Sequence, residues 1–185
     1  MNLFLWGALP YIAFTFLIVG TLVRFFYFER NWTTKSSEFL EKKQLRIANP
    51  LFHFGLLCVI GGHVVGVLIP KTWTAAIGIN DHMYHEGALY MGAVAGLIFI
   101  VGFLLLMKRR FTVAELKVNT SGLDKWLYLF LTLAIFSGMA GTLLNASGFF
   151  DYRVSIGPWF RSLLAFMPDP SLMEGVPFMF KFHMF

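Results

Sequence analysis

The sequence predicts an all-α membrane protein, a five-transmembrane-helix bundle that forms one domain over residues 1–185. Two features of its composition support this prediction, since 57% of the residues are hydrophobic and only 14% are charged. Soluble domains are about half apolar and a quarter charged. The third observation is a series of apolar runs near 20 residues long, the length that crosses a bilayer as a helix. The net charge of +5 lies mainly between these runs and does not indicate nucleic-acid binding.

The predicted spans cover residues 3–28, 50–69, 88–107, 126–145 and 177–185. Basic residues gather after the first and third spans, where Arg30 and the run from Lys108 to Arg110 stand. The positive-inside rule therefore places the N-terminus outside. The fifth segment is much shorter than the roughly 20 residues of a full span. We therefore expect the fifth helix to be truncated in this chain.

Two connections between the spans are amphipathic. Residues 29–48 combine basic and apolar positions at near-helical spacing, which predicts a short helix at the inner interface that anchors the membrane or docks a peripheral partner. Residues 147–176 are rich in aromatic side chains, and Trp159 and Leu163 belong to a predicted short helix on the outer surface. That helix is either a simple cover or one wall of a site for a lipid-soluble substrate.

The second span carries two histidines, His53 and His63. An imidazole in hydrocarbon is costly unless its nitrogens are satisfied. Ten residues separate the two Cα atoms by roughly 15 Å along a helix and by roughly 80° around it. Both rings can therefore enter one interhelical space at two depths. This arrangement favours two b-type haems, each with one axial ligand from this helix.

Glycines flank both histidines and would make room for a flat macrocycle; they are Gly55, Gly61, Gly62 and Gly66. The alternative is that each histidine is only hydrogen-bonded to a neighbouring helix and that Gly62 and Gly66 serve ordinary helix packing. The fourth span has no histidine, so we expect it to shield the cofactors, with Ser137, Gly138 and Gly141 giving room. The single cysteine, Cys58, excludes a four-cysteine iron–sulfur cluster within this chain.

His183 supplies the partner for one of the two histidines. His63 lies six residues before Ile69, where the second span meets the outer interface, and His183 lies six residues after Pro177. Each is therefore about 9 Å below the outer surface by helical rise. Two antiparallel helices thus present histidines at one level, as bis-histidine ligation of a single iron requires. His53 remains without a partner, and we expect its partner roughly 10 to 20 residues beyond His183.

These motifs resemble the gamma subunit of respiratory nitrate reductase, a membrane dihaem cytochrome b. The resemblance covers nearly the whole chain and is carried by YIAFTFLIVGTLVR, LFHFGLLCVIGGHVVGVLIP, LLLMKRRF, FDYRVSIGPWFR and EGVPFMFKFHMF. It implies that His63 and His183 are the axial ligands of the outer haem iron. It also implies that His53 is one axial ligand of the inner haem. The other axial ligand of that haem, the fourth of the two haems together, is missing from this chain.

The resemblance also implies a function in anaerobic respiration on nitrate. Quinol from the membrane pool would be oxidised at the outer side of a bacterial or archaeal cell membrane. Electrons would then pass through both haems to an iron–sulfur beta subunit and a molybdenum-containing alpha subunit, which reduces nitrate on the inner side.

Candidate residues for the quinol site lie at the start of the third span. His82, His85 and Glu86 are the polar side chains nearest the outer haem level, and histidine is suited to accept a proton near neutral pH. The family often has a basic residue at the position of Glu86, so we favour His85. The alternative is that all three are solvated loop residues. On the inner side Arg110 could pair with haem propionates, although ending a span also explains it.

Other functions are possible for such a sequence. The chain could serve another quinone-linked redox complex, because the subunit alone does not identify the terminal acceptor. It could instead be a haem-free transporter or scaffold, although it has no internal repeat and no intramembrane carboxylate. Direct catalysis on a small molecule by this chain is disfavoured, because two histidines would fill both axial positions of the outer iron.

Overall fold

The computed structural model describes residues 2–27 and 40–184, and every regular element in these two ranges is a helix. In chain order the elements are η1 (Phe4–Ala8), α1 (Leu9–Tyr27), α2 (Leu45–His63), η3 (Val64–Leu68), α3 (Lys71–Ala76), α4 (Asp81–Thr112), α5 (Ala114–Val118), α6 (Gly122–Leu144), α7 (Ile156–Leu164), η4 (Pro170–Met173) and α8 (Phe178–Met184). Four helical stretches are long and apolar enough to cross a membrane, and they lie at Phe4–Tyr27, Leu45–Leu68, Asp81–Thr112 and Gly122–Leu144. The chain is therefore an all-α membrane protein, as the sequence predicted.

The helix ends extend beyond the predicted apolar spans. The third predicted span, 88–107, lies inside the 32-residue helix α4. This helix begins at Asp81 because the Asn80 side chain accepts a hydrogen bond from the Met83 amide and so caps it. Residues 81–87, which precede the predicted span, are thus the first turns of α4. Ser121 and Asp124 start α6 as a capping box.

Helices α2 and α4 pack along their length, with glycines at their closest approach. A Cβ atom built on Gly55 of α2 would lie 2.5 Å from the backbone nitrogen of Phe99. In return, a Cβ atom on Gly102 of α4 would collide with the backbone of Phe52. Gly55 was predicted to make room for a macrocycle, and this was wrong because the backbone of α4 already fills that space.

This packing makes Gly55 and Gly102 sensitive positions. We expect Gly55→Ala and Gly102→Ala each to reduce the free energy of unfolding by at least roughly 1–3 kcal/mol, because backbone atoms cannot move aside as side chains can. Gly20→Ala in α1 is the matched control, since a Cβ atom added there would have nothing within 4 Å. Thermal unfolding of the detergent-solubilised protein measures the difference. Equal midpoints for all three variants would contradict this account of the packing.

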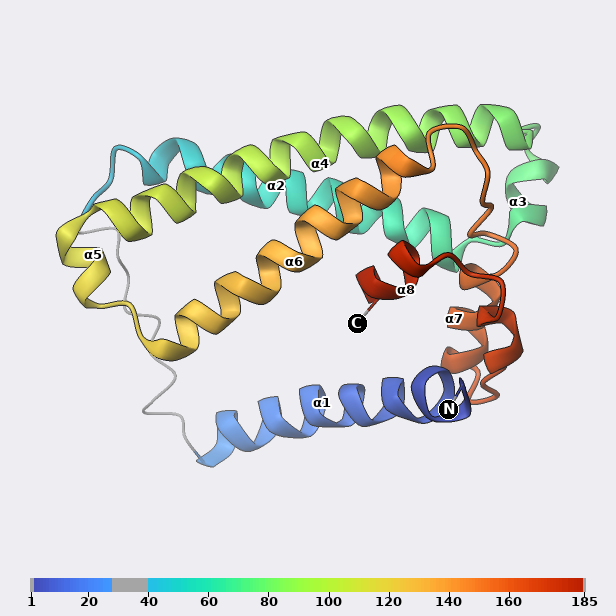
Figure 1. The fold of residues 1–185 in the computed structure, drawn as a ribbon, viewed down its shortest axis with the longest axis horizontal. Helices are drawn as coiled ribbons and strands as arrows, with labels where there is room; N and C mark the ends of the chain where they lie inside the picture. Colours follow the sequence, from blue (N-terminus) through green and yellow to red (C-terminus); the bar gives the residue numbers. More distant parts are fainter. Residues whose placement is uncertain (1, 28–39, 185) are drawn as a thin grey trace.

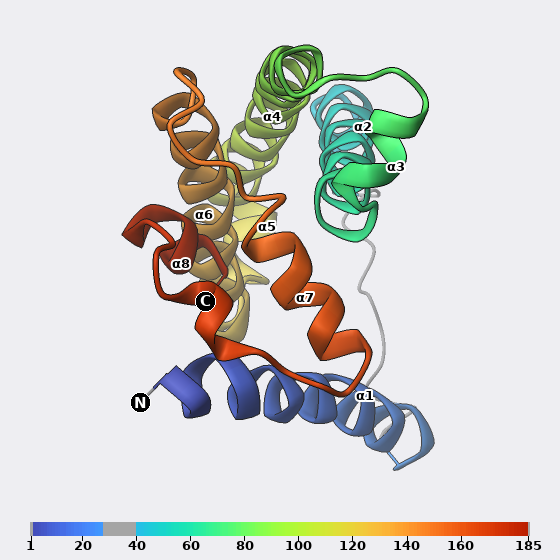
Figure 2. The ribbon, with the colours of Figure 1, turned by 90° about the vertical axis from the view of Figure 1, so that its right-hand side faces the viewer.

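A small-residue face on α4 packs against α6. A Cβ atom on Gly96 would meet Cε of Met139 at 2.5 Å, and one on Gly92 would meet Cγ2 of Thr142 at 3.9 Å. Both contacts are with α6, so this face joins α4 to α6. Helix α8 also packs against α6, as Figures 1 and 2 show.

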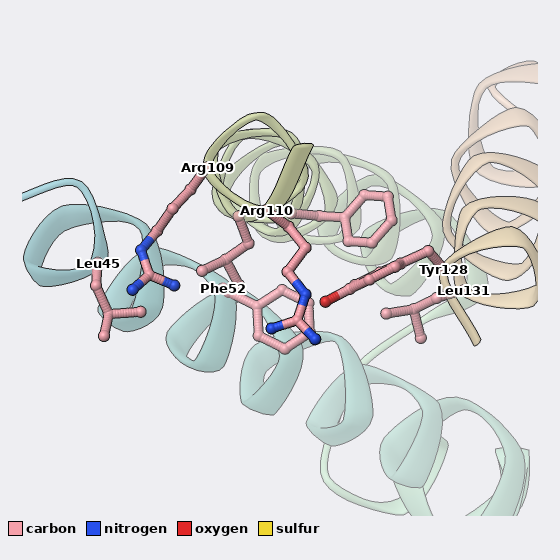
Figure 3. A pocket seen from close by; sticks show the side chains of 8 residues that line it. Leu45, Phe52, Arg109, Arg110, Tyr128 and Leu131 are labelled. Atoms are coloured by element: carbon pink, nitrogen blue, oxygen red, sulfur yellow. The ribbon is translucent and has the colours of Figure 1, made fainter. Parts of the chain in front are cut away.

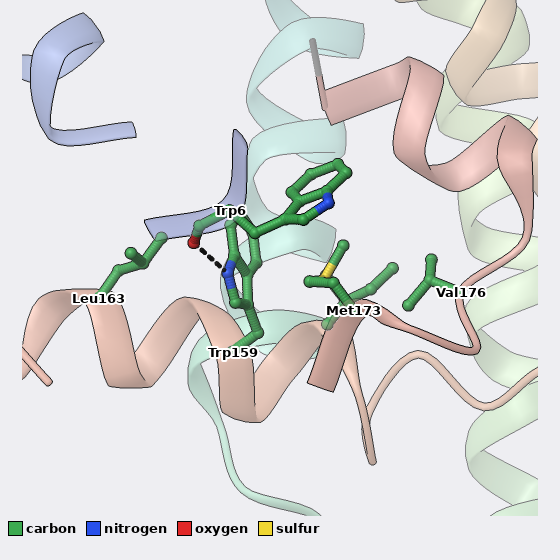
Figure 4. Close-up of a cluster of buried hydrophobic side chains, with 6 residues drawn as sticks. Trp6, Trp159, Leu163, Met173 and Val176 are labelled. Carbon is green, nitrogen blue, oxygen red and sulfur yellow. Dashed lines mark hydrogen bonds between the residues drawn. The ribbon is translucent and has the colours of Figure 1, made fainter. Parts of the chain in front are cut away.

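The end of the molecule that carries α3, α7 and η4 is here called the α7 end, and the opposite end, which carries α5, is called the α5 end (Figure 1). An apolar cluster lies at the α7 end. Its buried members are Trp6, Ile156, Trp159, Leu163, Met173 and Val176. The Trp159 indole Nε1 donates to the Trp6 carbonyl at 2.8 Å, and the two rings meet edge to face (Figure 4). The predicted short helix around Trp159 and Leu163 is thus observed as α7, and it fixes the start of the first span.

Beyond that anchor, α1 lies apart from α2, α4 and α6 in both views (Figures 1 and 2). Its apolar side chains are exposed along its length. This differs from the predicted bundle, in which all five spans pack together. The fifth predicted span is observed as the short helix α8. Most of the amphipathic helix predicted for residues 29–48 lies outside the described residues, and residues 45–48 form the first turn of α2.

Candidate functional site

The structure brings together His63 and His183, the two histidines matched by depth. His63 ends α2 and His183 lies in α8, and their ring centroids are 5.9 Å apart with an angle of 40° between the planes. Imidazole nitrogens bind metals at about 2 Å, so two imidazoles opposed across one metal have centroids roughly 6 Å apart. The spacing therefore fits one iron held between the two rings.

Hydrogen bonds fix the two histidines of α2 in the same way. Nδ1 of His63 lies 2.8 Å from the carbonyl of Val59, and Nδ1 of His53 lies 2.9 Å from the carbonyl of Asn49. A carbonyl only accepts, so Nδ1 is the protonated nitrogen in both rings. Nε2 then carries the free lone pair, the state in which a neutral imidazole binds a metal.

His183 receives its support from α6. Its Nδ1 lies 3.0 Å from the hydroxyl of Ser137, and that hydroxyl also donates to the carbonyl of Ala134 at 3.1 Å. Its ring lies directly over Gly138. The prediction that α6 only shields the cofactors was therefore incomplete, because this helix contacts the histidine of α8.

The glycines around the pair fall into two groups. Gly61 and Gly62 have open space where a Cβ atom would stand, which fits the predicted room for a macrocycle. Gly66 differs, because a Cβ atom there would meet Cε2 of Tyr152 at 3.0 Å and the Tyr84 hydroxyl at 3.4 Å. Gly66 thus makes room for two tyrosines. Among the described residues no group of three or more His, Cys, Asp or Glu side chains converges, so the histidine pair is not part of a larger ligand cluster.

A cavity of about 270 Å³ lies at the α7 end, beside the start of α4. Its lining residues are Asp81, His82, Tyr84, His85, Ser147, Gly148, Phe150, Asp151, Tyr152 and Arg153. The two tyrosines that contact Gly66 are part of this wall. Because Gly66 lies three residues after His63, the cavity and the histidine pair are separated by about one helical turn.

The three predicted quinol-site residues take different positions. His82 and His85 line the cavity, whereas Glu86 does not. Nε2 of His85 lies 3.1 Å from the carbonyl of Ala146, so Nε2 carries the proton and Nδ1 is the basic nitrogen. The ring also packs on Gly148, which has a positive φ of 71° and where an added Cβ atom would lie 3.4 Å from Nε2. His85 is thus held in place, while His82 is exposed.

Sequence reasoning did not single out the remaining walls of this cavity. The guanidinium of Arg153 stacks over the Tyr84 ring at 3.7 Å and donates to the Thr74 hydroxyl at 2.5 Å. Burial, together with a hydrogen bond to Tyr84, raises the pKa of Tyr152 above its usual range. Tyr152 therefore stays protonated and can donate a hydrogen bond. The signal was present in the motif FDYR, which holds two of these residues.

A cluster of three charged side chains lies beside the same cavity. Nζ of Lys71 lies 2.8 Å from Asp81 and 3.1 Å from Asp151, so it joins the start of α3 to α4 and to the loop after α6. The hydrogen bonds that Lys71 donates to the carboxylates of Asp81 and Asp151 raise the pKa of its amine. Both carboxylates line the cavity and give it an acidic edge.

A second cavity, of about 170 Å³, lies at the α5 end between α2, α4 and α6. Its lining residues are Leu45, Phe52, Phe103, Leu106, Arg109, Arg110, Tyr128 and Leu131. Arg109 is bound by Glu41, with 2.8 Å between Nε and Oε2. Arg110 extends toward Phe52 and Tyr128 (Figure 3). Its Nη2 lies 3.1 Å from Asp124, whereas its Nε is buried without a hydrogen-bond partner. Arg110 therefore keeps a free donor near the helix turn that carries His53.

The fold and these sites define a multi-pass, all-α membrane protein with a close pair of imidazoles contributed by two helices. Residues 2–185 match the family model described as nitrate reductase gamma subunit, and the chain belongs to this family. It is 47% identical to the nitrate reductase gamma chain of Bacillus subtilis (strain 168), over 97% of this chain and 81% of the relative.

More distant relatives cover the same region. The respiratory nitrate reductase 1 gamma chain of Escherichia coli (strain K12) is 27% identical over 100% of this chain and 82% of its own length. The nitrate reductase-like protein NarX of Mycobacterium tuberculosis (strain ATCC 25618 / H37Rv) is 38% identical over 96% of this chain and 28% of its own length.

Proposed function

We propose that this chain is the membrane cytochrome b subunit of a respiratory nitrate reductase in a bacterial or archaeal cell membrane. In this role it oxidises quinol at the α7 end and delivers electrons to partner subunits at the α5 end. Those partners are an iron–sulfur beta subunit and a molybdenum-containing alpha subunit that reduces nitrate. The observation that carries the proposal is the opposed pair of His63 and His183 in a chain of this family.

The residues fit both axial ligands of one b haem and one axial ligand of a second. His63 and His183 offer free Nε2 atoms at the spacing of one iron, with open space beside Gly61 and Gly62. His53 offers a free Nε2 nearer the α5 end, where Arg110 can bind a propionate. When bound, the haems supply one-electron transfer between the two ends of the membrane. The ligand opposite His53 is not one of the other four histidines, because these lie at the pair and at the α7 cavity.

The cavity at the α7 end suits quinol. Oxidation of one quinol to quinone releases two electrons and two protons. Nδ1 of His85 can accept a proton, since Nε2 already donates to Ala146. The protonated Tyr152 can donate a hydrogen bond to a substrate oxygen. The carboxylates of Asp81 and Asp151 line the same cavity and can accept the released protons. The electrons have about one helical turn to cross from this wall to His63.

The proposal is tested by adding quinol and then nitrate to anaerobic membranes that contain the assembled complex. We expect two b-type haems in the reduced-minus-oxidised spectrum, reduced by quinol and reoxidised by nitrate. A protein without haem would overturn the proposal in favour of a transporter or scaffold. Haems that quinol reduces but nitrate does not reoxidise would assign the chain to another quinone-linked complex.

A further inference from the structure

We infer that Ser137 and Gly138 of α6 form the seat of His183, fixing the tautomer and the position of this ring for the iron that it shares with His63. The inference rests on the proposed haem role of His183. It assigns a positioning function to a helix that carries no haem ligand. The two residues act differently, one through a hydrogen bond and the other through the lack of a side chain.

Ser137 acts as an acceptor. Its hydroxyl proton is used in the bond to the Ala134 carbonyl, so its lone pair faces Nδ1 of His183 at 3.0 Å. With the hydroxyl proton on the Ala134 carbonyl, Nδ1 carries the ring proton and Nε2 is left free, the same state that backbone carbonyls give to His53 and His63. His53 and His63 bond the carbonyl four residues earlier on their own helix, whereas Nδ1 of His183 lies 3.0 Å from the Ser137 hydroxyl of α6. The hydrogen bond is supplied by the neighbouring helix instead.

Gly138 acts as the surface on which the His183 ring rests. A Cβ atom there would lie 2.8 Å from Cε1 of His183 and 3.3 Å from each ring nitrogen. Those distances leave no room for a methyl group, because the atoms it would meet belong to a rigid ring. The ring would have to move along α6 or away from it, and either displacement changes its distance to His63.

A ligand's hydrogen bond affects the electronics of the metal as well as the geometry. A partner for Nδ1–H increases the basicity of Nε2 and makes it a stronger donor to iron. A stronger donor stabilises the oxidised iron more than the reduced iron. Ser137 is therefore expected to hold the potential of this haem lower than it would be without the hydroxyl.

The first test compares Gly138→Ala with Gly141→Ala in membranes that contain the assembled complex. Gly141 lies on the same helix, and a Cβ atom added there would meet only Cε1 of Phe180 at 4.0 Å. We expect Gly138→Ala to lose the haem signal that His63→Ala also loses, while Gly141→Ala keeps the wild-type haem content. Immunoblotting of the membranes shows whether each chain is inserted. Full haem content in inserted Gly138→Ala would refute the claim that the His183 ring needs a glycine at position 138.

The second test keeps the haem and measures its properties. Ser137→Ala is compared with Ser137→Thr, which retains a hydroxyl, and with Thr132→Val, which removes a hydroxyl bound only to the Tyr128 carbonyl. Redox titration and electron paramagnetic resonance are expected to show a raised potential and a shifted low-spin ferric signal for one haem in Ser137→Ala. Ser137→Thr should lie nearer the wild type, and Thr132→Val should match it.

These outcomes separate the seat from the proposed function. A wild-type complex without haem would refute the cytochrome proposal and the seat with it. A wild-type complex with both haems, in which Ser137→Ala leaves potential and resonance signal unchanged, would refute the role of Ser137 alone. A change in the haem that His53→Ala removes would contradict the assignment of the seat to the His63 site.

Discussion

Alanine in place of His63 and alanine in place of His183 are each expected to remove the same haem signal. The two ring centroids lie 5.9 Å apart, the spacing of two ligands on one iron, so we expect one iron to depend on both. A single imidazole cannot hold a bis-histidine haem in place, and we expect loss of that signal in each variant rather than a partial change. Spectra and pyridine haemochrome quantitation on membranes with equal amounts of the chain give the measurement.

His53→Ala provides the contrast within the same helix. It is expected to remove the other haem and to leave the His63–His183 signal in place, because ten residues separate the two histidines along α2. The double variant His63→Ala/His183→Ala should lose no more haem than either single variant. Loss of different signals from the two single variants would show that these histidines do not share an iron.

The pairing of His63 with His183 could be predicted from the sequence, because it depends only on the number of residues between each histidine and the membrane interface. Helical rise converts residue number into depth, and the interfaces are marked by Ile69 and Pro177. No knowledge of neighbouring helices was needed to place His63 and His183 at one level. The same counting could not show which side of each helix faces the other, and the structure supplies that information.

The glycines show where the sequence is ambiguous. Gly55, Gly62 and Gly66 look alike in an apolar helix, yet the first admits a helix backbone, the second lies beside open space and the third admits two tyrosines. A missing side chain records only that something approaches closely, and its identity depends on tertiary packing. For the same reason Ser137 and Gly138 resembled packing residues until His183 was placed on them.

The cavity at the α7 end was predicted in part because its polar residues come from two distant segments. His82 and His85 could be found from their position at the membrane surface. Tyr152 and Arg153 follow α6 in an irregular loop, whose path no periodic pattern predicts. Glu86 lies only one residue from His85, but that step turns it about 100° around α4 and out of the cavity wall.

His85→Gln is expected to slow quinol oxidation by roughly 10²-fold, the lower range for removal of a general base. Glutamine can still donate to the Ala146 carbonyl, so the variant keeps the contact that holds His85 and loses only the basic nitrogen. Both haems should remain fully reducible by dithionite. The rate of haem reduction after rapid mixing with quinol isolates the step from nitrate reduction.

Two neighbouring variants make the assignment specific. His82→Gln removes the other histidine of the cavity, which is exposed, and is expected to slow haem reduction less than His85→Gln does. Glu86→Gln changes a side chain outside the cavity wall and should reduce haem at the wild-type rate. A larger effect from Glu86→Gln than from His85→Gln would move the proton acceptor to the carboxylate. Wild-type kinetics in His85→Gln would show that quinol gives its proton to another group, because the histidine would then only support the loop at Ala146.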